Sequence, residues 1–571
     1  MYHRGVASLF VCLLGVIACA GNQADTPTLL VGNFATKGLL PKVLVSPGAD
    51  AVVGSTSASF SWSERVPQYQ VEIARDAAFS QVIVSKMTTS PNYTLASADL
   101  KPGENLASGM HYWRVRIPFV QNDLLSKTGA FYLQIIPEAG SGNFGKIYVN
   151  KNSSSLLQNG GTAAPYKSIQ TAIVAANTLR NSNRDIYFQI FVAQGTYNES
   201  ITQYAGISLY GGYNAALPDT NGEWTRNVAL YTTSITATGM RGVTYGSDVT
   251  AAYRAATVLD GFTVTGGAGE APYGVYLNNA SPTISNNRIN SGTPVFQVSA
   301  VYAMNNSAPV IQGNTITASQ QNAVGIDAHN CNGITIERNT IVALGTVYSA
   351  GLVIRNSATF RVLNNVVLGG TSNSAESIGI DLTTSTGEIA GNTIYAGQGS
   401  FTYGIELNSG TNVSIRNNVI FTTTAGGTRH CIYENGTGNN PVAVQNNNLF
   451  GCPTGVYRDA DNGCGGGATC SLAQMTALGA NYSGNVSIDN SGSQLFVDVD
   501  GADNNLGTMT DNDWRLTSNA AICDVRGGGL DLTTLYTSDR IMTNRTATLP
   551  SACTPTNTGA AGWSMGAYES D

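Results

Sequence analysis

Between residues 258 and 458 the sequence repeats a short phrase about every 26 residues. Each copy places an Asn three residues after one apolar residue and two residues before another, as in "PTISNNRI" and "GEIAGNTI". The repeated asparagines are Asn287, Asn314, Asn339, Asn365, Asn392, Asn418 and Asn447. A fixed period of this length is typical of stacked repeat architectures, in which each unit buries its apolar residues against its neighbours.

The repeat alternates apolar and polar residues with a period of two and is rich in β-branched residues, which predicts strands. Asn tolerates the left-handed backbone region that tight turns between strands use. When identical turns stack, each Asn amide can bond the Asn above and below. These properties predict an all-β chain whose main part is a right-handed parallel β-helix, a single-stranded solenoid.

The pattern "GIxL…NxI…NNxI" resembles the parallel β-helix repeats of pectin-lyase-like proteins, including the NosD-like families. The resemblance implies the fold and says little about function. Upstream, "PYKSIQTAIVAANTLRN" places Ile169, Ile173 and Ala176 at helical spacing. That run resembles the opening of DUF1565-type domains, in which an amphipathic helix caps the first coil. We therefore assign residues 146–460 to a β-helix with an N-terminal helical cap.

The N-terminus has a short basic start and an apolar run from Val6 to Ala18, which predicts a signal peptide over residues 1–18. Val16-Ile17-Ala18-Cys19 resembles the lipobox of bacterial lipoproteins. The resemblance implies lipidation of Cys19, a tether over residues 19–39 and an outer-membrane lipoprotein of the bacterial cell envelope, on its surface or periplasmic side. An ordinary secretory signal with an incidental Cys is the alternative.

Residues 40–137 read as a separate module of short alternating strands, which predicts a small β-sandwich. Trp62 and Trp113 are expected to anchor its core. The phrases "YQVEIARDAAF" and "HYWRVR" resemble bacterial fibronectin type III-like domains. Such domains are usually spacers or adhesion modules, so no chemistry is assigned to this part.

A second ladder within the repeat carries the candidate site. Its strands read "GVYLN", "AVYAM", "GIDAH", "GLVIR", "GIDLT", "GIELN", "CIYEN" and "GVYRD". Alternation predicts these inward residues: Val275, Val301, Ile326, Leu352, Ile380, Ile405, Ile432 and Val456. It predicts that their next neighbours face solvent: Tyr276, Tyr302, Asp327, Val353, Asp381, Glu406, Tyr433 and Tyr457. Two positions further on, His329 and Arg355 join the same face.

This face suggests three kinds of chemistry. Asp381 and Glu406 lie on neighbouring coils and Asp327 two coils from Asp381, so a pair of carboxylates could hydrolyse a glycosidic bond. His329 or Arg355 could assist proton abstraction, as in a polysaccharide lyase. The three carboxylates could alternatively bind Ca²⁺, which takes hard oxygen ligands. We expect the four tyrosines of the row (Tyr276, Tyr302, Tyr433 and Tyr457) to contact sugar rings.

Exposed solenoid faces must be polar somewhere, and Val353 interrupts the acidic row. The leading hypothesis is therefore a lipid-anchored protein whose β-helix binds polysaccharide or another extended extracellular ligand, such as a protein, without turnover. A polysaccharide lyase or glycoside hydrolase, and a structural or adhesive spacer, are the alternatives. The net charge of -7 and the lack of a basic cluster argue against nucleic acid as a partner. We expect a monomer and assign no metal ligands.

Six cysteines fall after residue 430, and proximity in sequence suggests the bridges Cys431–Cys452, Cys464–Cys470 and Cys523–Cys553. Cys331 would be left over. The segment 461–571 leaves the regular period, and "DNDWRLTSNAAICDVRG" and "GWSMGAYES" resemble the closing segment of secreted β-helix proteins. We expect the last irregular coils followed by a disulfide-braced C-terminal cap.

Overall fold

The computed structural model describes most of the chain beyond residue 143 and parts of residues 44–134. The described ranges are 44–46, 51–54, 59–62, 68–95, 99–102, 109–116, 129–134, 144–156, 158–182, 186–218, 222–270, 272–294, 296–370, 374–422, 426–489, 495–502, 512–545 and 553–569. The predicted signal peptide, the Cys19 anchor and the tether lie outside these residues. The chain divides into two compact units, one made mainly of residues before 148 and one made mainly of residues from 187 onward.

The first unit contains two β-sheets that share one core. The three-stranded sheet has the order β1-β3-β6, from Leu44–Ser46, Ser59–Trp62 and Asn92–Thr94. The five-stranded sheet has the order β2-β8-β7-β4-β5, from Ala51–Gly54, Gly129–Gln134, Gly109–Arg116, Tyr69–Ala74 and Val82–Thr88. Trp62 and Trp113 are buried in this core with Phe60 and Tyr69. The expected small β-sandwich is therefore present.

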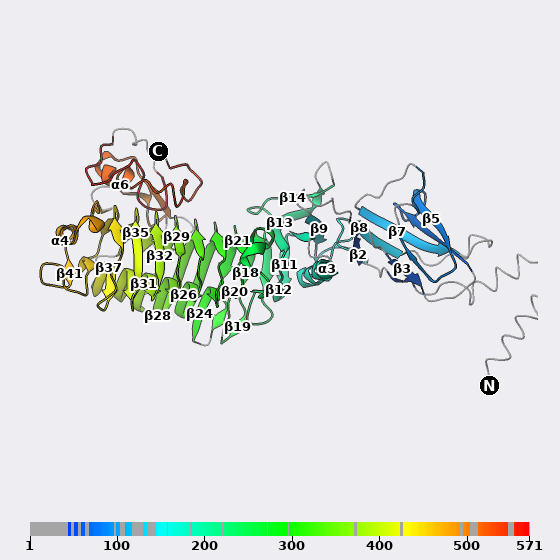
Figure 1. The fold of residues 1–571 in the computed structure, drawn as a ribbon, viewed down its shortest axis with the longest axis horizontal. Coiled ribbons are helices and arrows are strands. Elements are labelled where there is room, and N and C mark those ends of the chain that lie inside the picture. Colours follow the sequence, from blue (N-terminus) through cyan, green and yellow to red (C-terminus); the bar gives the residue numbers. More distant parts are fainter. Residues whose placement is uncertain are drawn as a thin grey trace, which may run out of the picture. The chain divides into compact units, whose positions relative to one another are not determined.

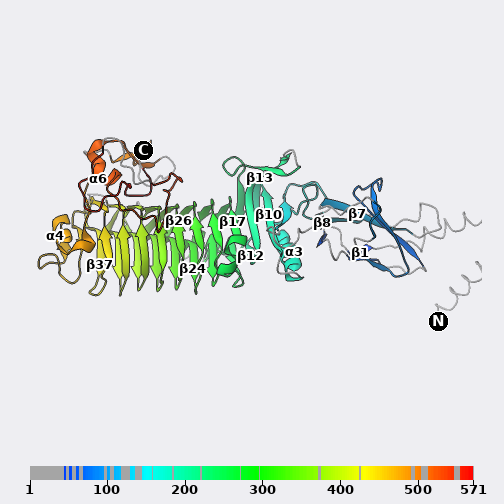
Figure 2. The same cartoon turned by 45° about the horizontal axis from the view of Figure 1, so that its top comes forward.

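The second unit is a parallel β-helix (Figures 1 and 2). One sheet stacks the strands β10 (Tyr187–Ala193), β13 (Ile207–Pro218), β17 (Val258–Asp260), β21 (Thr283–Ser285), β25 (Val310–Gln312), β27 (Thr335–Glu337), β29 (Phe360–Leu363), β32 (Thr386–Ala390), β35 (Asn412–Arg416) and β38 (Ala443–Gln445). A larger sheet holds the remaining strands of the stack in two rows.

The first row of the larger sheet contains β11 (Gly195–Asn198), β15 (Thr233–Thr236), β18 (Thr263–Thr265), β22 (Arg288–Asn290), β30 (Val366–Leu368), β33 (Thr393–Tyr395), β36 (Val419–Phe421) and β39 (Asn448–Phe450). The second row contains β12 (Ile201–Gln203), β16 (Val243–Tyr245), β20 (Val275–Asn278), β24 (Gln297–Met304), β31 (Ser374–Thr383), β34 (Gly399–Asn408), β37 (Thr428–Asn435) and β40 (Gly455–Arg458). The long strands β26 (Thr315–His329) and β28 (Thr340–Arg355) pass through both rows.

The repeated asparagines form the predicted ladder inside the stack. The side-chain oxygen of Asn392, for example, accepts bonds from the backbone N–H and the side-chain amide of Asn365, at 2.9 and 3.0 Å. The Asn392 amide in turn donates to the carbonyl of Val362 and to Asn418. The ladder continues past the sequence repeat to Asn485, which accepts bonds from Asn447. Each buried amide is thus fully used, so the ladder fixes the register of the coils.

The residue before each ladder Asn has a positive φ, between 51° and 72°. These residues are Asn286, Gly313, Arg338, Asn364, Gly391, Asn417, Asn446 and Gly484. Seven of the eight are Asn or Gly, the residues that adopt this backbone region at least cost. The "NN" and "GN" pairs of the repeat are therefore turn residues followed by ladder residues.

The predicted helix is present as α3 (Ile169–Ser182), and Ile169, Ile173 and Ala176 are buried. Its start is bonded to the first coils by Glu199, whose carboxylate accepts the backbone N–H groups of Ile169 and Gln170 at 3.0 and 2.9 Å. A carboxylate at this position satisfies the free N–H groups of the helix and complements its dipole.

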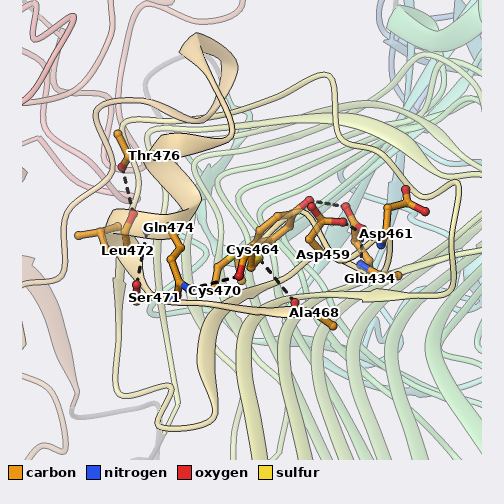
Figure 3. The surroundings of a disulfide bond; sticks show 12 residues. Glu434, Asp459, Asp461, Cys464, Ala468, Cys470, Ser471, Leu472, Gln474 and Thr476 are labelled. Carbon is orange, nitrogen blue, oxygen red and sulfur yellow. Dashed lines mark hydrogen bonds between the residues drawn. A yellow bond between two sulfur atoms is a disulfide. The ribbon is translucent and has the colours of Figure 1, made fainter. Parts of the chain in front are cut away.

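The other end of the stack is closed by residues 459–482 (Figure 3). Strand β41 (Thr469–Cys470) pairs antiparallel with β40, and the short helix α4 (Leu472–Ala477) follows with a capping box between Ser471 and Gln474. The Gln474 amide also donates to the carbonyl of Cys464. The three expected disulfides, Cys431–Cys452, Cys464–Cys470 and Cys523–Cys553, are present, and Cys331 is a buried free thiol.

The rest of the C-terminal segment differs from the cap expected at the end of the stack. Strands β42 (Phe496–Asp498) and β43 (Asp513–Leu516), helix α6 (Cys523–Arg526) and the described residues between 527 and 568 lie back along the side of the coils (Figures 1 and 2). Asn417 exchanges two bonds of 2.8 Å with the backbone of Leu530, and the backbone N–H of Ala567 donates to Thr393. The apolar outward residues of the first row draw the segment there.

Candidate functional site

The candidate site lies on the outward side of the second row, here called the outer face. It comprises the outward side chains of β20, β24, β31, β34 and β37 and of the second halves of β26 and β28. The inward residues are as predicted, since Val275, Val301, Ile326, Leu352, Ile380, Ile405 and Ile432 are all fully buried. The register also pairs Tyr302 with Asp327, Asp327 with Val353, Val353 with Asp381 and Asp381 with Glu406. The coil order inferred from the sequence is therefore correct.

A column of glycines changes the environment of this face. Gly325, Gly351, Gly379 and Gly404 precede the inward residues, and a Cβ at Gly325 would lie 2.4 Å from the Ile341 side chain in the core. Because both the glycine and the next residue occupy inward positions, alternation is broken there. Val324 and Asp327 consequently both lie on the outer face.

The residues before the glycines form one apolar cluster with Val353. The cluster contains Val324, Ala350, Val353, Ile378 and Tyr403, with Tyr348 and Tyr433 packed against it. It surrounds the carboxylates, so Asp327, Asp381 and Glu406 are only 3%, 6% and 5% exposed. The prediction that these side chains face open solvent is wrong, because side chains upstream of the glycines pack over them.

The charged residues join three successive coils of the outer face, those of β26, β28 and β31. His329 Nε2 lies 2.7 Å from Asp327 Oδ1 and 3.4 Å from the Arg355 guanidinium. Arg355 also pairs with Asp381 Oδ2 at 3.4 Å. His329 and Arg355 are about one-third exposed, whereas the carboxylates beneath them are buried. The structure therefore brings together four of the five predicted catalytic residues in one row of close polar contacts, here called the charged chain.

Asp381 has two further partners. The hydroxyl of Tyr348 donates to Oδ2 at 3.2 Å, and the amide of Asn408 donates to Oδ1 at 3.0 Å. With Arg355, three donors from the two coils on either side converge on one carboxylate, two from β28 and one from β34. Asp381 therefore holds three side chains of the outer face in place.

Glu406, the fifth predicted residue, has a different environment. Its Oε1 accepts a bond of 3.2 Å from Asn435. Burial, with the nearby charges of Asp381 and Glu376, raises the pKa of Glu406 to about 8. Asp381 and Glu406 thus lie in register on adjacent coils, and the charge of Asp381 contributes to the raised pKa of Glu406.

Aromatic residues flank this charged chain on both sides. Tyr276, Tyr302 and Tyr273 stack with ring centres 4.7 to 6.0 Å apart, and the Arg241 guanidinium lies 3.4 Å from the Tyr276 ring centre. At the other end, Tyr433 stacks on Tyr403 at 4.1 Å and lies under Arg458. Three of the four predicted tyrosines are therefore partly exposed on the outer face.

Tyr457 is the exception and is 1% exposed. In the last coil Ile432 pairs with Tyr457, so Tyr457 takes the inward position that the sequence assigned to Val456. A slip of one residue reverses the faces of a strand. The Tyr457 hydroxyl bonds Glu434, a carboxyl buried inside the end of the stack whose pKa burial raises to about 7. Tyr457 belongs to the closed end and not to the outer face.

Sequence reasoning missed Tyr348, Glu376 and Tyr403, which lie on the same strands as the predicted residues, upstream of the glycine. Alternation places Asn408 on the outer face, two residues past Glu406, but assigned it no role. The glycine that recurs in "VGID", "AGLV", "IGID" and "YGIE" was the available signal, since it marks where alternation breaks. His430 was also missed; it is 2% exposed, and burial lowers its pKa to about 4.

In the described part of the chain, no three His, Cys, Asp or Glu side chains are placed to hold a metal ion. Calcium binding stays a prediction without a structural site. Within the same residues, no helix has the length and apolar character that crossing a membrane would require.

The family model described as "right handed beta helix region" matches residues 245–394. A search of curated proteins found none that matches this sequence. Among solved structures, the chain is similar to the A-module of mannuronan C-5 epimerase AlgE4 from Azotobacter vinelandii, with 16% identity, 53% of this chain and 87% of that chain covered, and a TM-score of 0.30.

Two further solved structures are similar. The pectin methylesterase of Aspergillus niger has 15% identity, coverage of 54% of this chain and 90% of that chain, and a TM-score of 0.23. The family 28 exopolygalacturonase of Yersinia enterocolitica has 10% identity, coverage of 72% and 94%, and a TM-score of 0.13. The family match and the sheet topology establish a right-handed parallel β-helix, as predicted from the sequence.

Proposed function

We propose that the outer face binds a polysaccharide chain. The observation that carries the proposal is the layered construction of this face: buried carboxylates hold partly exposed donor and aromatic side chains in place. His329 and Arg355 are fixed by Asp327 and Asp381, and Tyr348 is fixed by Asp381. Burying charges weakens a fold unless they are paired, so such clusters on an outer surface are candidates for function.

The arrangement suits an extended ligand. Tyrosines at both ends and polar groups between them present one continuous row over successive coils, which are spaced about 4.8 Å apart. Side chains that are already held in one rotamer lose little entropy on binding, which favours affinity. Aromatic rings provide apolar contact area together with a hydroxyl group, as sugar rings require.

Cleavage of a glycosidic bond is the second candidate, favoured by the placement of Asp381 and Glu406 in register on adjacent coils. Glu406, with a pKa of about 8, would be the proton donor at neutral pH, and Asp381 would be the second carboxyl group of the pair. Their positions on adjacent coils suit the short carboxyl separation of retaining enzymes, about 5 Å. The burial of both groups favours binding without turnover as the first proposal.

The test incubates the full chain with polygalacturonate, alginate and a neutral glucan, with and without Ca²⁺. Retention on each polymer and release of new reducing or unsaturated ends are measured. Retention that is lost in Arg355→Ala supports the outer face as the binding site. New chain ends that disappear in Asp381→Ala/Glu406→Ala would establish the second candidate. No retention of the wild-type chain on any polymer would overturn the proposal.

We also propose, from the lipobox resemblance, that Cys19 anchors the chain to a bacterial envelope membrane. Metabolic labelling with a radioactive fatty acid tests this. Label in the wild-type chain and none in Cys19→Ala is the expected result. Equal labelling of both chains, or release of the wild-type chain as a soluble secreted protein, would contradict it.

A further inference from the structure

The outer face has an apolar rim at the upstream ends of its strands. Phe296, Val347 and Phe401 are exposed to 72%, 49% and 50% of their surface. Large apolar side chains exposed together beside polar groups are typical of ligand or partner contacts. The described part of the chain leaves these three side chains largely exposed, in contrast to the covered outward residues of the first row.

The register places the rim beside the charged chain. Tyr348, Glu376 and Phe401 follow one another in a single column across three coils. Val347 immediately precedes Tyr348, whose hydroxyl reaches Asp381. Phe296 precedes Gln297, which occupies the same column two coils before Tyr348. Phe401 therefore lies in a column parallel to the row of carboxylates, and Phe296 and Val347 each lie one residue upstream of that column.

The spacing of the two phenylalanines matches a long ligand. Strands β24 and β34 are four coils apart, so Phe296 and Phe401 are about 19 Å apart along the stack. Apart from Glu376, the rim column carries no charge: its other members are Gln297, Asn322, Tyr348, Phe401 and Thr428. The rim thus offers apolar contacts at two separated points, next to polar groups that can bind hydroxyls.

We propose that Phe296 and Phe401 hold the apolar faces of sugar rings at two separate positions of one polysaccharide chain, which lies along the stack axis over the outer face. This inference rests on the proposed function. It adds the orientation of the bound chain relative to the stack axis, and it names two residues that make affinity depend on the length of the sugar chain. A protein partner at the rim would use the same exposed area but would show no dependence on sugar chain length.

The experiment measures binding of the full chain to the polymer retained best in the panel and to a disaccharide from the same polymer. Phe296→Ala, Phe401→Ala and the double variant are compared with Leu230→Ala, which removes an equally exposed apolar side chain (65%) away from this face. Each Phe variant is expected to weaken polymer binding on the order of tenfold, the double variant more, and Leu230→Ala not at all. A disaccharide is too short to contact both rings, so its affinity changes in at most one single variant.

The outcomes separate the two proposals. If the wild-type chain binds no polymer, both the proposed function and the rim are overturned. If it binds and both Phe variants bind equally well, only the rim is overturned. If polymer and disaccharide lose affinity equally in both single variants, the ligand does not lie along the stack, and the inference is wrong. Circular dichroism of each variant confirms that the fold is intact, as expected for exposed positions.

Discussion

The two rows of the larger sheet present outward surfaces of opposite character. In the first row, Val342, Leu368, Tyr395, Phe421 and Phe450 follow one another in register and are at most 7% exposed. The returning C-terminal segment covers them with Leu495, Phe496, Trp514, Leu516, Ile522, Val525 and Met565. In the second row, the corresponding column holds tyrosines, aspartates, a glutamate and Val353, and the side chains that pack over its carboxylates come from its own strands.

The change of character also occurs along a single column of the first row. Before Val342 the column reads Thr265, Asn290 and Thr317, which are partly exposed. The covering segment therefore begins where the outward residues become apolar. Outward polarity, and not the strand itself, decides which part of this solenoid is covered by the returning segment.

Replacing Trp514 with Ala is expected to give the largest effect. The Trp514 ring packs within 5.8 Å of the Phe421 ring and 5.6 Å of the Phe496 ring. The loss of a buried Trp should lower the free energy of unfolding by about 3–5 kcal/mol. Phe401→Ala, on the exposed rim, should change it by no more than about 0.5 kcal/mol. Unfolding in denaturant measures both variants. Equal losses of unfolding free energy would show that the first-row surface is no more a part of the core than the rim is.

Much of this fold could be predicted from the sequence because the Asn phrase carries both the period and the turn. Asn392, for example, is recognised by its spacing from Ile389 and Ile394, and the structure gives it the expected ladder bonds. Asn485 could not be found in this way, since 38 residues and a helix separate it from Asn447. The path of the returning segment depends on long-range apolar contacts that have no local pattern.

The site could be predicted only in part. Alternation correctly placed Asp327, Asp381 and Glu406 on one side of their strands, because residue parity fixes the face of a strand. Their burial could not be predicted, since it depends on a glycine that places Ile378 and Tyr403 beside them. Tyr457 was misplaced for a related reason: the last coil slips by one residue, and no repeat follows that would show it.

The pH dependence of folding stability also compares the two surfaces, because each surface contains a buried glutamate. Burial and the neighbouring Asp381 and Glu376 raise the pKa of Glu406 on the outer face to about 8, and burial raises the pKa of Glu569 in the covering segment to about 7. Each group binds its proton more tightly in the folded chain than in the unfolded chain, where its pKa is near 4.5. Their contribution to stability is therefore complete below pH 4.5 and is lost as pH rises through 7 to 8.

Substitution should nevertheless have opposite results at pH 8. Glu406→Gln removes a group that resists ionisation, so the variant should be more stable than wild type there and should show a flatter pH dependence. Glu569 pairs with the buried Arg545 at 3.0 Å, so Glu569→Gln leaves that cation without its partner and should cost about 3 kcal/mol. Thermal unfolding from pH 5 to pH 8 checks both. A gain in stability for Glu569→Gln at pH 8 would contradict the role of the pair.

Two disulfides allow the covering segment to be compared with the closed end of the stack. Cys523–Cys553 spans 30 residues of the covering segment, whereas Cys464–Cys470 spans 6 residues at the closed end. By loop-closure entropy, replacing each pair with Ser should lower stability by about 3.5 and about 2 kcal/mol respectively. Only the first replacement should expose the first-row apolar residues and increase the fluorescence of a hydrophobic dye. An equal increase in dye fluorescence in both variants would mean that Cys523–Cys553 does not hold the covering segment against the coils.

The smallest predicted effect isolates one bond of the outer face. Tyr348→Phe removes the hydroxyl that donates to Asp381 at 3.2 Å and leaves Arg355 and Asn408 as its partners. Stability should fall by about 1 kcal/mol or less, because a single hydrogen bond has a small net value. Polysaccharide binding should weaken more than stability does, since Arg355 is then less firmly held at the surface. Tyr568→Phe, which removes a hydroxyl that accepts a bond of 3.2 Å from Arg540 in the covering segment, is the matched control away from the outer face. If Tyr348→Phe lowers stability but leaves binding unchanged, the buried carboxylates stabilise the coils and do not hold the exposed side chains ready for a ligand.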